Sequence, residues 1–204
     1  MSLKKLTQKK PTQKKPKRIE LMTGTLIGQQ SLGDLLTALA ARQPTPGGGA
    51  AAAISVAIAC ATGAMACRYT TGDKWPAVTV EATALAQQLD TWRDQAVTLA
   101  DADAAAYAAV GAAKKSADPA RIATAQQSAA AVPVQLIALC VTAATACAGF
   151  RPRCNQWLVS DIDTAVHLMA GAGRAARRTM MVNQPDDGQI ADADRAMVQL
   201  TRLE

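Results

Sequence analysis

The chain has 204 residues, of which 50% are apolar and only 3% are aromatic, and its formal net charge is +6. A chain of this length forms one domain or two small ones and can bury a substantial core. Alanine, the best helix former, dominates, and the absence of β-branched or aromatic runs of strand length argues against a β-sheet protein. We expect an all-α fold, a helical bundle with long antiparallel helices and crossover loops. Because each alanine buries little surface, we also expect a homodimer that shares its core.

The positive charge is concentrated at the N-terminus. Residues 1–18 carry eight lysines or arginines and no acid, so subtracting these eight charges from +6 leaves −2 for the rest of the chain. This polar, proline-interrupted composition predicts a disordered basic tail over 1–24, followed by a helical domain over 25–204. Nucleic acid or a membrane surface would attract such a tail, but a merely solvated leader has the same composition. We favour the solvated leader and expect neither a nucleic-acid nor a membrane partner.

Helix signals follow along the chain. Ser31, with Asp34 three residues later, resembles a capping box and predicts a short helix over about 31–41. Prolines, glycines and further capping residues divide the rest of the chain into helical segments. These are expected at about 48–71, at about 78–115, from Pro119 to Phe150 with a kink or break at Pro133, from a capping box at Ser160 and Asp163 to near Asn183, and at about 190–203.

Two runs without charged residues, 44–67 and 122–150, are long enough to span a membrane. Alanine, threonine, serine, glutamine and glycine fill them, which favours buried core helices. The cysteines within and after these runs recur at intervals of seven residues and lack a CxxC pair, as expected for free thiols in a core. Free thiols and the absence of a signal-peptide segment predict a cytoplasmic protein. The five cysteines are Cys60, Cys67, Cys140, Cys147 and Cys154.

The segment PTPGGG at 44–49 leads directly into the first uncharged run. Its prolines and glycines interrupt regular structure, and the helix that follows presents free N–H groups at its N-terminus. Such a terminus favours an anionic or electron-rich ligand, so Thr45, Gly47, Gly48 and Gly49 are candidate binding residues. A plain turn would account for the same glycines.

One aspartate interrupts an apolar face. In the helix expected over 78–115, residues spaced by three and four are apolar from Leu85 to Val110, except for Asp103. Burial disfavours a charged carboxylate unless it is paired or protonated, and it raises the pKa toward the range useful for proton transfer. Asp103 is therefore a candidate catalytic residue, or else a core aspartate that satisfies a neighbouring helix end. We expect ordinary solvated charges at Asp90, Asp94 and Asp101 on the opposite face.

The other titratable residues give no alternative site. His167, the only histidine, lies four residues after Asp163, which predicts an exposed ion pair rather than catalysis. The sequence contains no Ser–His–Asp set, HExxH motif, P-loop or dinucleotide-binding fingerprint.

Several motifs, in this order, resemble a known family. PTPGGG at 44–49, TTGDK at 70–74, LADADAAAY at 99–107, NQWLVSD at 155–161 and VN at 182–183 are similar to the cyclodeaminase domain of formiminotransferase-cyclodeaminase. They are equally similar to stand-alone bacterial methenyltetrahydrofolate cyclohydrolases. The resemblance extends from about Leu32 to Asn183.

This resemblance implies roles for particular residues. Asp103, four residues before Tyr107, matches the family's proposed catalytic acid/base. Asn155, Ser160 and Asp161 become candidate ligand contacts, although Ser160 and Asp161 could simply cap a helix. Asn183 could bind the pterin or cap a helix C-terminus.

The chain also departs from the family pattern. Of the lysines common after TxG, only Lys74 is present, as a candidate contact for the substrate's glutamate. Ala105 replaces an acidic residue, Thr179 replaces an asparagine, and Cys154 replaces a glycine. The arginines at 174, 177 and 178 could bind a polyglutamate tail or complement the helix dipole; we favour the dipole.

The resemblance implies hydrolysis of 5,10-methenyltetrahydrofolate to the formyl form, with no metal and no redox cofactor. One alternative is a formiminotetrahydrofolate cyclodeaminase that releases ammonia. A second, from another class, is a non-catalytic helical bundle that binds folate, another pterin or a protein.

Overall fold

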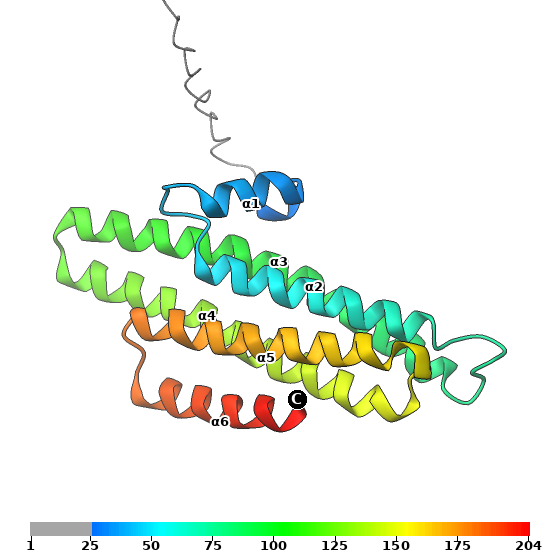
Figure 1. The fold of residues 1–204 in the computed structure, drawn as a ribbon. Helices are drawn as coiled ribbons and strands as arrows, with labels where there is room; N and C mark the ends of the chain where they lie inside the picture. The colour runs from blue at the N-terminus through cyan, green and yellow to red at the C-terminus, as the bar shows by residue number, and fades with distance from the viewer. Residues whose placement is uncertain (1–25) are drawn as a thin grey trace, which may run out of the picture.

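The computed structural model describes residues 26–204, so the basic tail predicted over 1–24 lies outside the described part of the chain. The described residues contain no strand, which confirms the all-α fold (Figure 1). The helices are α1 (Leu32–Ala40), α2 (Gly48–Arg68), α3 (Thr79–Ser116), α4 (Pro119–Phe150), α5 (Val159–Val182) and α6 (Asp187–Leu203), with short 3-10 helices η1 (Ile27–Gln29), η2 (Arg151–Arg153) and η3 (Gln156–Leu158).

Four long helices form the body of the molecule. Helix α2 packs against α3 and α5, and α4 packs against the same two helices. Successive long helices run in opposite directions, with α6 alongside α4 and α5, and α1 at the opposite side of the bundle (Figure 1). Residues 69–78 and 151–158 connect the helices at one end of α2, and residues 41–47 lead into its other end.

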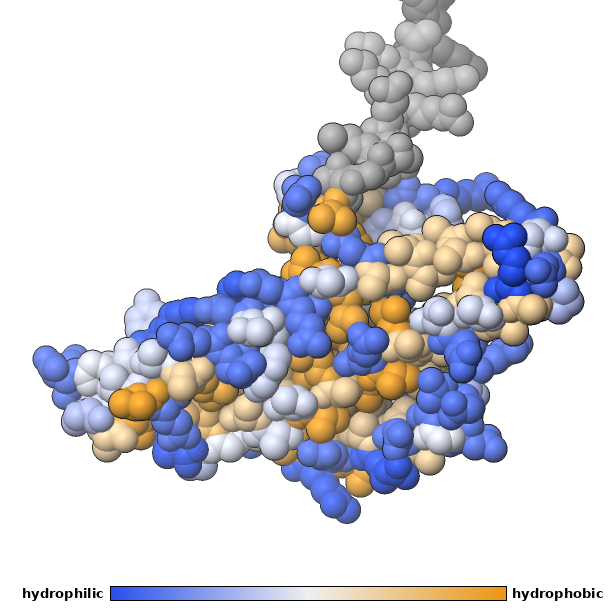
Figure 2. All heavy atoms as spheres, turned by 180° about the vertical axis from the view of Figure 1, so that it is seen from behind, coloured by the Kyte–Doolittle hydropathy of each residue, from blue (hydrophilic) through white to orange (hydrophobic). Residues whose placement is uncertain are grey.

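Small residues allow the central helices to approach one another closely. A Cβ atom added to Gly63 of α2 would lie 3.1 Å from the Sγ atom of Cys147 in α4 and 3.3 Å from the Cδ1 atom of Leu89 in α3. Larger side chains, including those of Phe150 and Ile162, are fully buried and fill the remaining space. On the face shown in Figure 2, hydrophobic residues also reach the surface in the middle of the bundle, between hydrophilic margins.

Several helix ends differ from the predictions. Ser31 does cap α1, since its Oγ atom accepts a hydrogen bond from the Asp34 N–H at 3.1 Å. Helix α4 runs unbroken through Pro133, so of the predicted kink or break the break is wrong; Pro133 is buried within the bundle. Helix α6 begins earlier than predicted because Asp186 forms a capping box with Gln189.

The predicted ion pair between His167 and Asp163 is also wrong. Asp163 instead pairs with Arg151 at 2.6 Å, and the imidazole of His167 lies 3.4 Å from the carboxylate of Glu204. Arg174 donates two hydrogen bonds to the same carboxylate, and these lower the pKa of Glu204 to about 2. Asp163 and His167 therefore both pair with residues from other segments of the chain and not with each other, although they lie four residues apart on one helix.

The two helices that contain the uncharged runs are core helices. By length and composition, α2 and the segment 119–153 could each cross a membrane, but 61% and 50% of their apolar windows are buried inside the bundle. As predicted, all five cysteines are free and buried. Burial raises the pKa of Cys60, Cys67, Cys140 and Cys147 to about 12.

The close approach at Gly63 gives a test of the core. We expect Gly63→Val to lower the free energy of unfolding by about 1–3 kcal/mol, because the added methyl groups overfill a site where four helices converge. Gly171→Val is the matched control, since no atom lies within 4 Å of a Cβ added to Gly171 in α5. Urea denaturation followed by circular dichroism measures both variants. Equal midpoints would show that the core relaxes freely around Gly63.

Candidate active site

The start of α2 is the centre of the candidate site. Gly47 is its N-cap residue, has no side chain and so provides no capping hydrogen bond. The N–H groups of the first turn therefore need another acceptor. Asp103 of α3 supplies it: the Ala50 N–H donates a hydrogen bond of 3.1 Å to the Oδ2 atom of Asp103. Asp103, which belongs to the neighbouring helix, thus performs the function of an N-cap side chain for α2.

Gly49 makes room for this carboxylate. A Cβ atom at Gly49 would lie 2.1 Å from the Oδ1 atom and 2.4 Å from the Cγ atom of Asp103, distances that no real side chain tolerates. The glycine is required because a carboxylate rests against its Cα, and not because of its backbone angles. Of the three glycines in the loop motif, Gly49 thus has the clearest structural role.

Two opposing effects act on the Asp103 carboxyl. Partial burial raises its pKa above the usual aspartate range, and the hydrogen bond from Ala50 lowers it. Oδ2 is held by the helix terminus, and Oδ1 has no hydrogen-bond partner among the described residues. Asp103 therefore satisfies a helix end, as one of the two interpretations drawn from the sequence states. The catalytic role of its other oxygen stays a prediction.

The C-terminal end of α5 adjoins the same site. A Cβ atom on Gly48 would lie 3.8 Å from the Cγ2 atom of Thr179, so Thr179 faces the glycine segment with its methyl group. The Thr179 hydroxyl is turned away and donates to the Ala176 carbonyl. Asn183 caps α5, and its side chain donates to the Thr179 carbonyl at 3.4 Å. The structure thus gathers Asp103, the loop that contains Thr45 and Gly47, and Asn183 at one end of the bundle.

The remaining predicted site residues lie at the other end of α2. Lys74 is exposed in the connection between α2 and α3, and Asn155, Ser160 and Asp161 lie where α5 begins (Figure 1). Helix α2 has 21 residues, which corresponds to a length of about 30 Å. One chain therefore does not bring the two groups together.

Two local predictions need correction. Ser160 does not cap α5, because η3 continues directly into the helix, Leu158 is the N-cap residue, and Ser160 lies in the first turn. Asn155 is the side chain that caps here: it accepts a hydrogen bond from the Trp157 N–H at 3.1 Å. Asp101 is not simply solvated, since its Oδ1 atom accepts a hydrogen bond of 2.7 Å from the Ile27 N–H and ties η1 to α3. A partner 74 positions away leaves no periodic signal in the sequence.

The charges near these residues are largely engaged in ion pairs. Asp90 pairs with Arg68 and Arg93, and Arg93 also bonds Asp94. In α5, Arg177 pairs with Asp194, as Arg174 does with Glu204. Two of the three arginines considered for a polyglutamate tail thus bind acids of the C-terminal helix segment.

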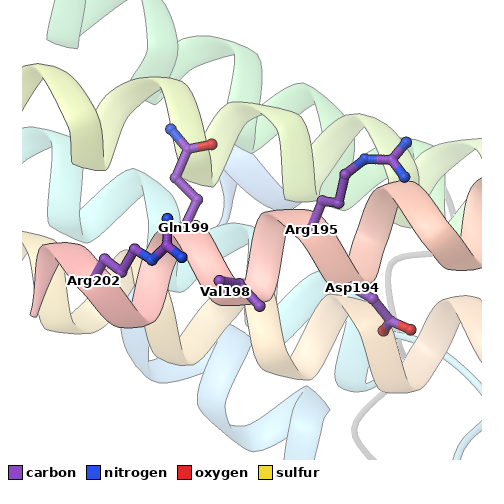
Figure 3. A pocket seen from close by; sticks show the side chains of 5 residues that line it. All are labelled: Asp194, Arg195, Val198, Gln199 and Arg202. Carbon is purple, nitrogen blue, oxygen red and sulfur yellow. The ribbon is translucent and has the colours of Figure 1, made fainter.

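Two hollows are found in the described surface. One is formed along α6, where Figure 3 shows the side chains of Asp194, Arg195, Val198, Gln199 and Arg202. Another lies between α3 and α4 beside Phe150. Neither contains a predicted site residue. Among residues 26–204 there is also no group of three or more His, Cys, Asp or Glu side chains that could hold a metal ion.

Comparison with known proteins defines the class. The fold resembles the crystal structure of formiminotetrahydrofolate cyclodeaminase from Thermotoga maritima, with a TM-score of 0.79 over 87% of this chain and 91% of that one, at 24% sequence identity. The protein is thus an all-helical bundle of the cyclodeaminase fold. Residues 31–199 match the family model described as Formiminotransferase-cyclodeaminase, and the chain belongs to this family. No match is found among curated protein sequences.

The contact between Gly49 and Asp103 yields a prediction. We expect Gly49→Ala to reduce the activity of the site by about 100-fold. The new methyl group would clash with the Asp103 carboxylate and push it out of its present position. Gly111→Ala in α3 is the matched control, since a Cβ added there meets nothing within 4 Å. Steady-state kinetics of both folded variants measures the effect. Equal activities would show that the position of Asp103 is unimportant.

Proposed function

We propose that the protein is a one-carbon folate enzyme that hydrolyses 5,10-methenyltetrahydrofolate to the formyl form, with Asp103 as general acid and base. The observation that carries this proposal is the placement of Asp103 against Gly49, with one oxygen held by Ala50 and the other unpartnered among the described residues. Family membership supports a tetrahydrofolate derivative as the substrate, as does the name of the Thermotoga protein.

The proposed reaction begins with attack of water on the cationic methenyl carbon. As the carbon–oxygen bond forms, Asp103 accepts one proton of the water, which gives a tetrahedral carbinolamine. Asp103 then returns this proton to the departing folate nitrogen as the carbon–nitrogen bond breaks. The hydroxyl proton leaves to solvent as the formyl carbonyl forms. All steps are proton transfers and addition or elimination at carbon, so they call for no metal and no redox cofactor.

The surroundings of Asp103 suit both halves of this cycle. Burial raises the pKa of the carboxyl and so makes it a better proton acceptor. The hydrogen bond from Ala50 acts in the opposite direction, because it stabilises the anionic form. In its anionic form the carboxylate also stabilises the positive charge of the methenyl group. We propose that Thr45, Gly47, Gly48 and Asn183 contact the pterin near this carboxylate.

Cyclodeamination is the second candidate, and the family description and the Thermotoga enzyme favour it. In that reaction a folate nitrogen attacks the formimino carbon and ammonia leaves, and Asp103 would carry protons between the two nitrogens. The same carboxylate geometry serves both reactions. A non-catalytic folate-binding bundle is a third candidate, motivated by Ala105 and by the single lysine at position 74.

Substitution of Asp103, together with assays of both folate substrates, tests the three candidate functions. We expect Asp103→Asn to lower kcat by about 10²–10⁴-fold, because it removes proton transfer while retaining the size of the side chain. Loss of ultraviolet absorbance of methenyltetrahydrofolate, corrected for spontaneous hydrolysis, measures hydrolysis, and ammonia release from formiminotetrahydrofolate measures cyclodeamination. Wild-type turnover of the formimino compound alone would support the cyclodeaminase. Turnover of neither compound by folded protein would support the binding bundle.

The pH dependence provides an internal control. Below the raised pKa of Asp103 the carboxyl is protonated and cannot accept a proton, so we expect wild-type kcat/KM to fall as the pH is lowered through that pKa. The residual activity of Asp103→Asn should lack this acidic limb. An acidic limb that persists in the variant would assign it to another group.

We further propose that the active form is a homodimer in which each site uses both chains. The supporting observation is that Asp103 and the group formed by Lys74, Asn155, Ser160 and Asp161 lie at opposite ends of α2. The helix is uncharged from Gly48 to Cys67. Its outward side carries partly exposed apolar residues, namely Ile54, Ile58 and Met65.

A two-fold axis near the middle of α2 would bury this apolar side. Two copies of α2 would then run antiparallel, so that the start of one lies beside the end of the other. Asp103 of each chain would face the Lys74 and Asp161 end of its partner. This arrangement completes two equivalent sites and gives the alanine-rich core the additional buried surface expected from its composition. Free thiols suit a cytoplasmic location for this dimer.

Heterodimers test the shared site. Asp103→Asn and Asp161→Asn chains carrying different tags are co-expressed, and the mixed dimer is purified through both tags. If sites are shared, one of its two sites contains both native residues, so we expect about half of the wild-type activity. Homodimers of either variant are the controls. A mixed dimer that is no more active than the mean of the two homodimers would mean that each chain carries its own site.

A further inference from the structure

Two exposed aromatic side chains lie at the end of α2 remote from Asp103. The chain has only six aromatic residues, and two of these are Tyr69, which is 66% exposed, and Trp157, which is 80% exposed. Large aromatic side chains contribute most to stability when they are buried. Their exposure on the same end of the bundle is therefore unexplained by folding.

One side chain holds the two residues next to each other. The Nδ2 atom of Asn155 donates a hydrogen bond of 3.5 Å to the carbonyl of Tyr69, and its Oδ1 atom accepts one of 3.1 Å from the N–H of Trp157. Tyr69 ends α2 and Trp157 lies in η3, so a single amide joins segments far apart in the sequence. The nitrogen and the oxygen of the Asn155 amide thus each hold the backbone of one aromatic residue.

A buried hydroxyl makes this junction rigid. Thr70 is fully buried, and its Oγ1 atom accepts a hydrogen bond of 3.1 Å from the Asn155 N–H while donating one of 2.8 Å to the Ala66 carbonyl. The same hydroxyl lies 3.6 Å from the Sγ atom of Cys154. The backbone under both aromatic residues is therefore fixed before any ligand arrives, as binding sites require.

We propose that Tyr69 and Trp157 form a surface that binds the flat, conjugated pyrimidine ring of the substrate's pterin. This inference rests on the proposed function, in which that pterin belongs to a tetrahydrofolate derivative. Aromatic faces bind flat conjugated rings by stacking, and polar groups around them set the orientation. Asn155 is then a positioning residue rather than a ligand contact.

The charges at this end suit the rest of such a substrate. Lys74, in the connection that follows Tyr69, forms no ion pair among the described residues and can meet a carboxylate of the glutamate portion. Arg68 is already paired with Asp90. In the proposed dimer, the aromatic surface of one chain flanks Asp103 of the other. The ring is thereby held on one subunit while its reacting carbon meets the carboxylate of the partner.

Substitutions on the aromatic surface test the inference. We expect Trp157→Ala to weaken binding of tetrahydrofolate, measured by isothermal titration calorimetry, by about tenfold or more, and Tyr69→Ala to weaken it less. Trp157→Phe, which retains an aromatic face, should bind nearly as well as wild type. Val198→Ala on α6, where the native side chain is 53% exposed, is the matched control and should bind as wild type does. KM should rise in step with the dissociation constant while kcat changes little.

The outcomes separate this inference from the proposed function. Unchanged tetrahydrofolate binding and KM in Trp157→Ala, with normal turnover, would overturn the aromatic surface alone. A change in sedimentation coefficient without a change in binding would also overturn it, because these residues would then be a subunit contact. Weakened binding in a protein whose wild type turns over neither folate substrate would support the surface and reject the proposed chemistry. Absence of tetrahydrofolate binding by wild-type protein would overturn the inference.

Discussion

The contact between the carboxylate of Asp103 and the first turn of α2 is the constraint on which the site depends. It exists because three features coincide: a helix start with no capping side chain, a glycine that leaves space, and an acid on the facing helix. Removing any one would leave unsatisfied N–H groups or a clash. The same contact fixes the register between α2 and α3, so the geometry of the chemistry and the packing of the bundle are specified together.

Much of this could be predicted from the sequence because it follows from local periodicity. Asp103 stood out as the only charged residue on an apolar face, and the glycine segment lies at the start of an uncharged helix. The identity of the helix end that Asp103 satisfies could not be obtained in the same way. It depends on a contact between residues 53 positions apart, for which spacing along one helix carries no information.

The errors share a physical cause. The sequence predicts partners for Ser160 and His167 within their own helix, because residues three and four positions apart can make contact there. In the structure, a 3-10 turn leads directly into α5, and the C-terminal Glu204 lies beside His167. Local pairs on a helix surface contribute little, so a partner brought close by the tertiary fold prevails. Predictions from spacing were therefore good for buried faces and poor for exposed charges.

The candidate residues are divided between the two ends of α2, so one complete site with both groups would need two chains. A single chain carries both sets of residues, and α2 is the element that separates them. Its composition without charges from Gly48 to Cys67 would be a liability on the surface of a monomer. In the proposed two-fold assembly the same composition would form an interface, and the length of the helix would set the distance between the two sites.

The buried thiols give the bundle a built-in reporter of its own opening. A thiol reacts with alkylating reagents and disulfides only as the thiolate, and the pKa of about 12 imposed by burial on four of the cysteines leaves almost none in that form near neutral pH. These residues lie on α2 and α4, in the middle of the molecule. Labelling them therefore requires the central helices to separate. Since one pair is on each helix, the order in which cysteines become modified would reveal which side of the core loosens first.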